Sequence, residues 1–223
     1  MLLLAIDTSA AASGALFEAG AVTAEFLTES TRHHAEELAT GIAGILGGPE
    51  PEQQRCPQAV IVGVGPGPFT GLRAGIATAR MLSFTWQVPL YGVMSLDALG
   101  WAAVTGPENI RPRAEFLVAT DARRSEVYWA RYDAEGTLLE GPSVGSAREL
   151  PPDLPVYGAG AGRYAEELSE RVIPEFAEAQ PRAAELAALA ARRLDHGESL
   201  LDSTPLYLRE SDAKIPGPRK RAL

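Results

Sequence analysis

The feature that most constrains the fold of this chain is an internal repeat in the layout of its strands. Residues 2–26 read as an apolar strand that ends at Asp7, a polar turn, a second strand, a glycine turn and a third strand. Residues 115–140 have the same layout, and Asp121 takes the place of Asp7. A repeated layout of this length indicates that one structural unit occurs twice. We therefore expect two related copies, each beginning with a three-stranded antiparallel meander.

The order of elements in the first copy indicates its fold class. After the meander, apolar residues with helical spacing predict a helix from about Arg32 to Leu46. A strand, a helix over roughly residues 70–85, another strand and a helix that starts at Ser95 follow. The predicted order βββαβαβα belongs to the α/β class. The segment 104–113 has the turn composition of a linker between the two copies.

The second copy becomes shorter toward its end. A short strand, a glycine-rich turn and a helix are predicted within residues 155–168. A last helix within residues 180–197 has Pro181 near its first position and Gly197 just beyond its end. We therefore predict two lobes, of which the second is reduced. The predicted domains are residues 1–105, residues 106–212 and a basic, disordered tail of residues 213–223.

Charge and cysteine content exclude several classes of protein. The formal net charge of −9 gives the chain no general attraction for the phosphates of a nucleic acid. The single cysteine, Cys56, excludes an internal disulfide and fits a reducing compartment, and no histidine near it in sequence could activate it. The N-terminus lacks the basic start of a signal peptide, and no apolar run approaches the ~20 residues of a membrane span. We expect a cytoplasmic protein.

Residues 63–73, GVGPGPFTGLR, form a loop that resembles a phosphate-binding turn in composition only. The loop contains no lysine, so it is not a Walker motif. Its glycines approach a dinucleotide-binding spacing, but the loop follows the fourth predicted strand instead of the first. Pro66 and Pro68 also remove backbone donors that a phosphate would need. The loop is therefore expected to set the start of the following helix.

Two helices of the first copy carry residues that suit a subunit contact. Gly71, Gly75 and Ala79 recur every four residues, with Thr78 beside them, so another backbone could approach this stripe closely. The stripe could pack on the chain's own sheet or on a partner, and the partner is slightly favoured. The helix from about Arg32 to Leu46 is apolar over more than one face, which leaves Leu38 or Ile45 for a partner.

Two places in the sequence have residues that could suit a metal or nucleotide site. His33 and Glu37 lie four residues apart on one helix face, but no third metal ligand is visible in the sequence. Asp7 and Asp121 could hold a metal–nucleotide between two lobes, as in actin-like ATPases. The turns that follow them, DTSAAASG and DARRSEV, lack the required glycines, which argues against an independent ATPase. No catalytic, cofactor-binding or metal-binding residue is predicted.

Six segments, in order along the chain, resemble one known family. They are AIDTS, GPGPFTGLRAGIATAR, GVMSLDAL, DARRSEVYWARY, GAGAGRY and PLYLR. Together they resemble the bacterial TsaB (YeaZ) family of tRNA threonylcarbamoyladenosine biosynthesis. The resemblance covers about residues 1–132, with further islands near 156–168 and 204–210. The family usually has serine where this chain has Pro68, so any role of that hydroxyl is absent here.

The resemblance implies a duplicated actin-like (ASKHA, ribonuclease H-like) α/β fold of two lobes, each with a mixed sheet and helices. It implies a non-catalytic scaffold that activates a paralogous transferase, TsaD, together with the ATPase TsaE. That complex places threonylcarbamoyl on N6 of adenosine 37 in tRNAs that read codons beginning with A, and this subunit meets tRNA only through the complex.

The resemblance also implies a homodimer when the chain is isolated. No cofactor is expected on the chain alone, although the interface with the partner leaves room for a nucleotide. A stand-alone actin-like kinase or ATPase is the alternative. The candidate interface residues are His33, Glu37, Leu38, Ile45, Gly71, Gly75, Thr78 and Ala79.

Overall fold

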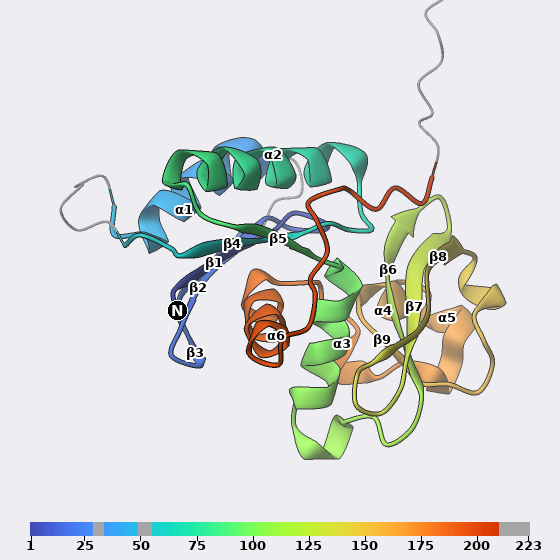
Figure 1. Cartoon of the computed structure of the whole chain (residues 1–223). Coiled ribbons are helices and arrows are strands. Elements are labelled where there is room, and N and C mark those ends of the chain that lie inside the picture. Colours follow the sequence, from blue (N-terminus) through green and yellow to red (C-terminus); the bar gives the residue numbers. More distant parts are fainter. Residues whose placement is uncertain (29–33, 49–54, 210–223) are drawn as a thin grey trace, which may run out of the picture.

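The computed structural model describes residues 1–28, 34–48 and 55–209, with backbone only for residues 34–36, and contains two mixed sheets (Figure 1). The five-stranded first sheet has the order β3-β2-β1-β4-β5, and the four-stranded second sheet has the order β8-β7-β6-β9. The strands of the first sheet are β1 (Leu3–Asp7), β2 (Ser13–Glu18), β3 (Ala21–Leu27), β4 (Ala59–Gly63) and β5 (Leu90–Val93). Those of the second sheet are β6 (Phe116–Arg123), β7 (Glu126–Tyr132), β8 (Leu138–Gly145) and β9 (Val156–Tyr157).

The two sheets share one connectivity. β1 pairs antiparallel with β2 and parallel with β4, and β6 pairs antiparallel with β7 and parallel with β9. Asp7 ends β1, and Asp121 lies near the end of β6, so the two aspartates occupy corresponding places. The predicted repeat and the predicted order βββαβαβα of the first copy are therefore confirmed.

The helices cover both faces of the first sheet. β1 and β4 are buried along their whole length, which is typical of strands enclosed on both faces. Leu4 and Ile6 of β1 pack in the core shared with α1 (His34–Ile45) and α2 (Phe69–Trp86). Leu3 and Ala5 point to the other face, where α6 (Ala183–Asp195) packs. Figure 1 shows α1 and α2 on one side of this sheet and α6 on the other.

α6 follows the second sheet in sequence but packs on the first sheet and beside α3 (Ser95–Thr105). Gly197 follows α6 with φ +71, and its N–H donates to the Leu194 carbonyl, as predicted for a glycine that ends a helix. The helix begins two residues later than its proline suggested, because Arg182 occupies the N-cap position and Pro181 precedes it. The boundary between residues 105 and 106 stays a prediction.

The second lobe is smaller, and its glycine-rich segment differs from the prediction. Residues 159–163, expected as part of a turn, form α4 (Ala159–Arg163), which α5 (Ala165–Leu168) follows. A Cβ at Gly160 would lie 2.8 Å from the Ala119 carbonyl carbon of β6, so glycine here permits close packing of α4 on the strand. Short 3-10 helices complete the fold at Glu108–Ile110, Ala147–Glu149, Ser169–Arg171 and Pro174–Phe176.

A buried polar cluster joins the lobes. The Asp97 carboxylate of α3 accepts hydrogen bonds from the Tyr132 hydroxyl of β7 at 3.0 Å and from Arg193 of α6 at 2.9 Å. Burial raises the pKa of Asp97, and Arg193 opposes that shift. Within the residues that the structure describes, no helix is long and apolar enough to cross a membrane. The predicted tail, residues 213–223, lies outside the described residues.

Candidate functional site

The first aspartate turn is closed by hydrogen bonds within the protein. Asp7 is 0% exposed. Its Oδ1 accepts from the Ser9 backbone N–H at 2.8 Å and from the Ser9 hydroxyl at 2.7 Å, and its Oδ2 accepts from the Ser95 hydroxyl at 2.6 Å. Burial raises the pKa of Asp7, and the serine hydrogen bonds oppose the shift. Both carboxylate oxygens are therefore occupied by the chain's own donors.

The glycine–proline loop is built onto this turn. Ser95 Oγ accepts from the Gly65 N–H at 3.2 Å, and the Ser95 N–H donates to the Gly65 carbonyl at 2.8 Å. A Cβ at Gly63 would lie 1.9 Å from Asp7 Oδ2, and one at Gly67 would lie 2.8 Å from the Ser9 Cα. The loop thus packs directly on the turn that contains Asp7 and Ser9.

α2 begins immediately after this loop. Pro68 is its N-cap residue, and no side chain caps the helix there. Pro68 therefore supplies no hydroxyl to the first free N–H groups of the helix. The loop positions α2 through the backbone bonds to Ser95 instead.

The small-residue stripe of α2 faces inward. The Thr8 hydroxyl donates to the Gly71 carbonyl at 2.8 Å, and a Cβ at Gly75 would lie 2.2 Å from Thr8 Oγ1. Ala79 is fully buried in the same core, and Thr78 is half-buried. The slight preference for a partner-facing stripe is therefore wrong: glycine is required here because the turn after β1 touches the helix.

The candidate residues on α1 are divided between the core and its edge. Leu38 is 0% exposed and packs in the core, so its side chain is not available to a partner on the surface. Ile45 is partly buried against the same core, and Glu37 is half-buried. His33 lies outside the described residues. Whether Glu37 and Ile45 contribute to an interface stays a prediction.

The outward face of α2 carries an apolar surface that the sequence interpretation did not identify. Phe84 is 76% exposed and Met81 is 67% exposed. Residues 201–209 run along this helix: the Arg73 side chain donates to the Tyr207 hydroxyl at 3.2 Å, and Arg80 donates to the Ser203 carbonyl at 2.8 Å.

These side chains frame a hollow of 710 Å³ between α2 and the C-terminal segment. It is lined by Arg73, Ile76, Ala77, Arg80, Met81, Phe84, Pro205 and Tyr207. The α2 members of this set recur with the period of one helix face, which was visible in the sequence. We call residues Arg73, Arg80, Met81, Phe84 and Tyr207 the outer face.

The second aspartate turn is blocked in a different way. Asp121 lies 3.6 Å from Arg123 and 3.4 Å from Arg163 in ion pairs, and the Tyr164 hydroxyl lies 3.4 Å from its Oδ1. The turn residues Arg123 and Arg124 have left-handed backbone conformations, with φ of 62° and 57°. Arginine side chains therefore stand where a phosphate would need open backbone.

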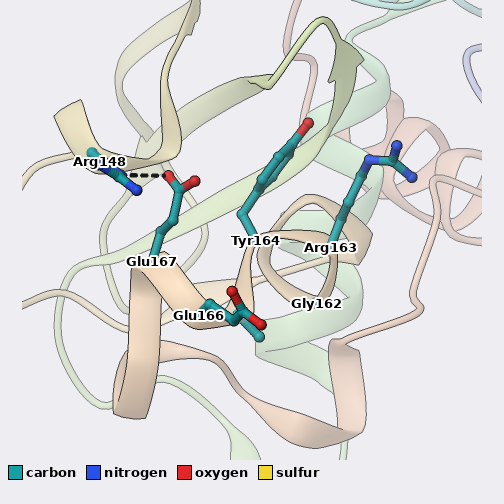
Figure 2. A pocket seen from close by; sticks show the side chains of 7 residues that line it. Arg148, Gly162, Arg163, Tyr164, Glu166 and Glu167 are labelled. Carbon is teal, nitrogen blue, oxygen red and sulfur yellow. Dashed lines mark ion pairs between the residues drawn. The ribbon is translucent and has the colours of Figure 1, made fainter.

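A polar hollow of 740 Å³ lies beside this turn. It is lined by Arg148, Gly162, Arg163, Tyr164, Ala165, Glu166 and Glu167. Figure 2 shows Tyr164 between Arg163 and the Arg148–Glu167 ion pair, whose atoms are 3.3 Å apart. The basic groups of this hollow already have acidic neighbours, so it offers no concentrated positive charge to an anion.

Comparisons with known proteins show which family this chain resembles. A family model described as TsaD, tRNA N6-adenosine threonylcarbamoyltransferase, matches residues 24–151. An uncharacterized protein of Mycobacterium leprae is 37% identical over 96% of this chain, which spans only 56% of that relative's length. The tRNA threonylcarbamoyladenosine biosynthesis protein TsaB of Escherichia coli is 29% identical, over 97% of this chain and 99% of its own.

A solved structure supports the fold directly. YeaZ from Pseudomonas aeruginosa superposes with a TM-score of 0.74 at 29% identity, covering 93% of this chain and 99% of its own. Together with the two related mixed sheets, this match confirms the duplicated α/β fold that the sequence predicts.

Proposed function

Because the chain belongs to the TsaB (YeaZ) family, we propose that it works in tRNA threonylcarbamoyladenosine biosynthesis as a non-catalytic subunit that activates the paralogous transferase TsaD. The observation that carries this proposal is the state of the two aspartate turns. Both oxygens of Asp7 accept hydrogen bonds from serine donors, and Asp121 is paired with arginines. Neither carboxylate is free to hold a metal–nucleotide, so the chain contributes structure to a complex in which TsaD performs the transfer.

The outer face, formed by α2 side chains and Tyr207, is the proposed docking surface for TsaD. Large apolar side chains that are mostly exposed favour burial against another protein. α2 contains Arg73 and Arg80 but no acidic residue, although the whole chain is acidic. The matching surface of the partner is therefore apolar with carboxylates at its rim. A homodimer of the isolated chain uses the same face.

We propose the rest of the complex from the resemblance to the family. In this proposal TsaE is the associated ATPase, and tRNA contacts this chain only as part of the cytoplasmic complex, which adds threonylcarbamoyl to N6 of adenosine 37. A nucleotide, where one is bound, lies at the interface between subunits. The alternative, a stand-alone actin-like kinase or ATPase, requires turnover by the chain alone.

A reconstitution separates these two functions. The chain, TsaD and TsaE are combined with tRNA and threonylcarbamoyl-adenylate, and modified adenosine is measured by mass spectrometry of the nucleosides. We expect no modification and no Mg-ATP hydrolysis by the chain alone, and modification by TsaD that rises when the chain is added. Hydrolysis of Mg-ATP by the purified chain would instead support the stand-alone ATPase.

A surface variant tests the docking face. Phe84→Glu places a charge in the proposed interface and is expected to weaken TsaD binding by at least about tenfold. The matched control is Leu139→Glu on β8, where another exposed apolar side chain lies outside the outer face. Calorimetry and sedimentation measure binding to TsaD and dimerisation. Equal losses of TsaD affinity in both variants, or no loss in Phe84→Glu, would exclude this face as the docking surface.

A further inference from the structure

The last segment that the structure describes, residues 201–209, touches both lobes, and we call it the strap. It contains PLYLR, one of the six segments that carry the family resemblance, of which the proposed docking surface uses only Tyr207. In Figure 1 the strap is the red coil that leads from α6 past α2 to the second sheet. The strap has no helix and a single isolated β-bridge, so its position depends on contacts with the rest of the chain.

Backbone hydrogen bonds attach the strap to the first lobe. Next to β5, the edge strand of the first sheet, the Gly92 N–H donates to the Leu201 carbonyl at 2.7 Å, and the Leu201 N–H donates to the Gly92 carbonyl at 3.0 Å. A Cβ at Gly92 would lie 2.0 Å from the Asp202 carbonyl oxygen, so glycine permits this close approach. Farther along, the Leu206 N–H donates to the Val64 carbonyl at 2.8 Å. The strap is therefore fixed at β5 and at the start of the glycine–proline loop.

Side chains fasten the strap to α2. The Arg80 side chain donates to the Ser203 hydroxyl at 2.9 Å, in addition to its bond with the Ser203 carbonyl. The centres of the Tyr207 and Phe69 rings are 4.9 Å apart, and the Arg73 guanidinium lies 3.6 Å from the centre of the Phe69 ring. Arg73 also donates to the Tyr207 hydroxyl, so these three side chains form one cluster. The cluster places Tyr207 on the outer face.

The other end of the strap is attached to the second lobe. Arg209 donates at 2.9 Å to the Ala122 carbonyl, which belongs to the second aspartate turn, and forms an ion pair with Glu126 of β7. Leu208 packs against the core of the second lobe. Leu206 packs against that core and also against the first-lobe core beneath α1 and α2. The strap thus links the second aspartate turn to α2 through a leucine that contacts both cores.

The strap has few contacts that would hold any one part of it in place alone. Three backbone hydrogen bonds join it to the rest of the described chain, and Leu201 and Tyr207 are 46% and 40% exposed. Segments of this kind open locally at a lower free energy than the whole fold. Because Leu206 lies between the first-lobe anchor at Leu201 and the second-lobe anchor at Arg209, loss of one anchor should weaken the other contacts of the strap.

We propose that the strap docks as one cooperative unit that couples the second aspartate turn to the outer face. Arg209, attached to the second lobe, keeps Leu206 between the two cores, and Leu206 keeps Tyr207 against α2. The outer face is therefore complete only when the strap is attached to both lobes. The consequence for the partner rests on the proposed function: TsaD contacts Tyr207, so it binds the docked strap preferentially and in return stabilises it.

Hydrogen exchange in the full-length chain tests this cooperativity. Arg209→Ala removes the anchor on the second lobe and is expected to speed exchange of the Leu201 and Leu206 amides by at least about threefold. Leu201 is the sharpest reporter, because it lies at the opposite end of the strap and bonds to β5. NMR resolves the individual amides, and thermal melting of each variant shows that the fold is retained before exchange is compared.

Two further variants separate the strap from its surroundings. Glu126→Gln weakens the ion pair with Arg209 and leaves the sequence of the strap unchanged, so it should speed exchange of the same amides by a smaller factor. Arg163→Ala is the matched control, because Arg163 pairs with Asp121 of the same turn instead of with the strap. This control should leave exchange of the strap amides unchanged.

Three results would each overturn the proposal. No acceleration at Leu201 in Arg209→Ala, with any change confined to residue 209 and residues 122–126, would show that the contacts are independent. Equal acceleration throughout the chain would show that the strap does not open separately from the fold. Equal acceleration of the Leu201 amide by Arg163→Ala would show that the charge of the turn, and not the anchor of the strap, is responsible.

Addition of TsaD separates this proposal from the proposed function. TsaD should slow exchange of the Leu201 amide in the wild-type chain by at least about threefold, and Arg209→Ala should bind TsaD more weakly than the wild-type chain does. If the variants behave as expected without TsaD but TsaD leaves exchange unchanged, the strap is confirmed and docking of TsaD on the outer face is excluded. The measurements on the chain alone involve neither TsaD nor tRNA, so their failure does not count against the proposed function.

Discussion

Asp7 and Asp121 occupy the same place in two copies of one layout, but their surroundings differ. Asp7 is fully buried and bonded to two serines, whereas the Asp121 side chain is 17% exposed and is paired with two arginines. In the first lobe, the occupied carboxylate fixes the loop that starts α2. In the second lobe, ion pairs at the surface neutralise the carboxylate. A duplicated site is therefore closed by buried hydrogen bonds in one copy and by ion pairs in the other. The two closures should contribute differently to the stability of the fold.

The largest expected effect comes from the helix that covers the first turn. Gly75→Leu is expected to destabilise the fold by about 3 kcal/mol or more, because even a Cβ would overlap Thr8. The control is Gly44→Leu in α1, where nothing lies within 4 Å of an added Cβ and a helix former should be neutral or stabilising. Urea unfolding measures both. A stable Gly75→Leu variant would mean that α2 does not touch this turn.

The aspartates themselves give the next largest effect. Asp7→Ala leaves the buried Ser9 and Ser95 donors without an acceptor and is expected to lower the free energy of unfolding by about 2–4 kcal/mol. Asp121→Ala removes ion pairs near the surface and should lower it by less than about 1 kcal/mol. Similar losses in the two variants would show that the lobes do not differ in the way described here.

The smallest expected effect is on the pH dependence of stability. The pKa of Asp7 is raised in the folded protein above its unfolded value near 3.8, so the folded state retains this proton more strongly. The carboxyl's contribution is therefore fully present below the unfolded pKa and is lost as pH rises through the folded pKa. The stability difference between the wild-type chain and Asp7→Asn should shrink as pH rises over that window. Urea unfolding at several pH values measures this stability difference. A difference that widens as pH rises would contradict a raised pKa of Asp7.

The sequence predicted the elements and the duplication because both depend on local patterns. Apolar strand runs, glycine turns and helical spacing are properties of neighbouring residues, so the predicted order of elements along the first copy and the predicted helix α2 agree with the structure. The direction of the Gly75 stripe could not be obtained in this way, since it depends on Thr8, which is distant in sequence. The same holds for the hollow beside the outer face, which α2 forms together with the distant residues Pro205 and Tyr207.

The candidate site was predicted least completely, for a related reason. The turns without glycine argued against phosphate sites at Asp7 and Asp121, which stays a prediction, but the donors next to these carboxylates come from elsewhere, such as Ser95 and Arg163. The exposed Met81 and Phe84 were present in the helical pattern. The sequence interpretation does not include them, because it uses small residues instead of large apolar ones to predict a subunit contact.

The position of α6 has a consequence for how the chain is made. One face of the first sheet packs against this helix, yet residues 183–195 are synthesised after both sheets. Domains usually fold as units in order of synthesis, with the N-terminal one first. Here the first lobe cannot complete its core until α6 has left the ribosome. Its apolar surface stays open to chaperones throughout translation, and a transcript truncated before α6 would yield an unfinished first lobe as well as a shortened second one.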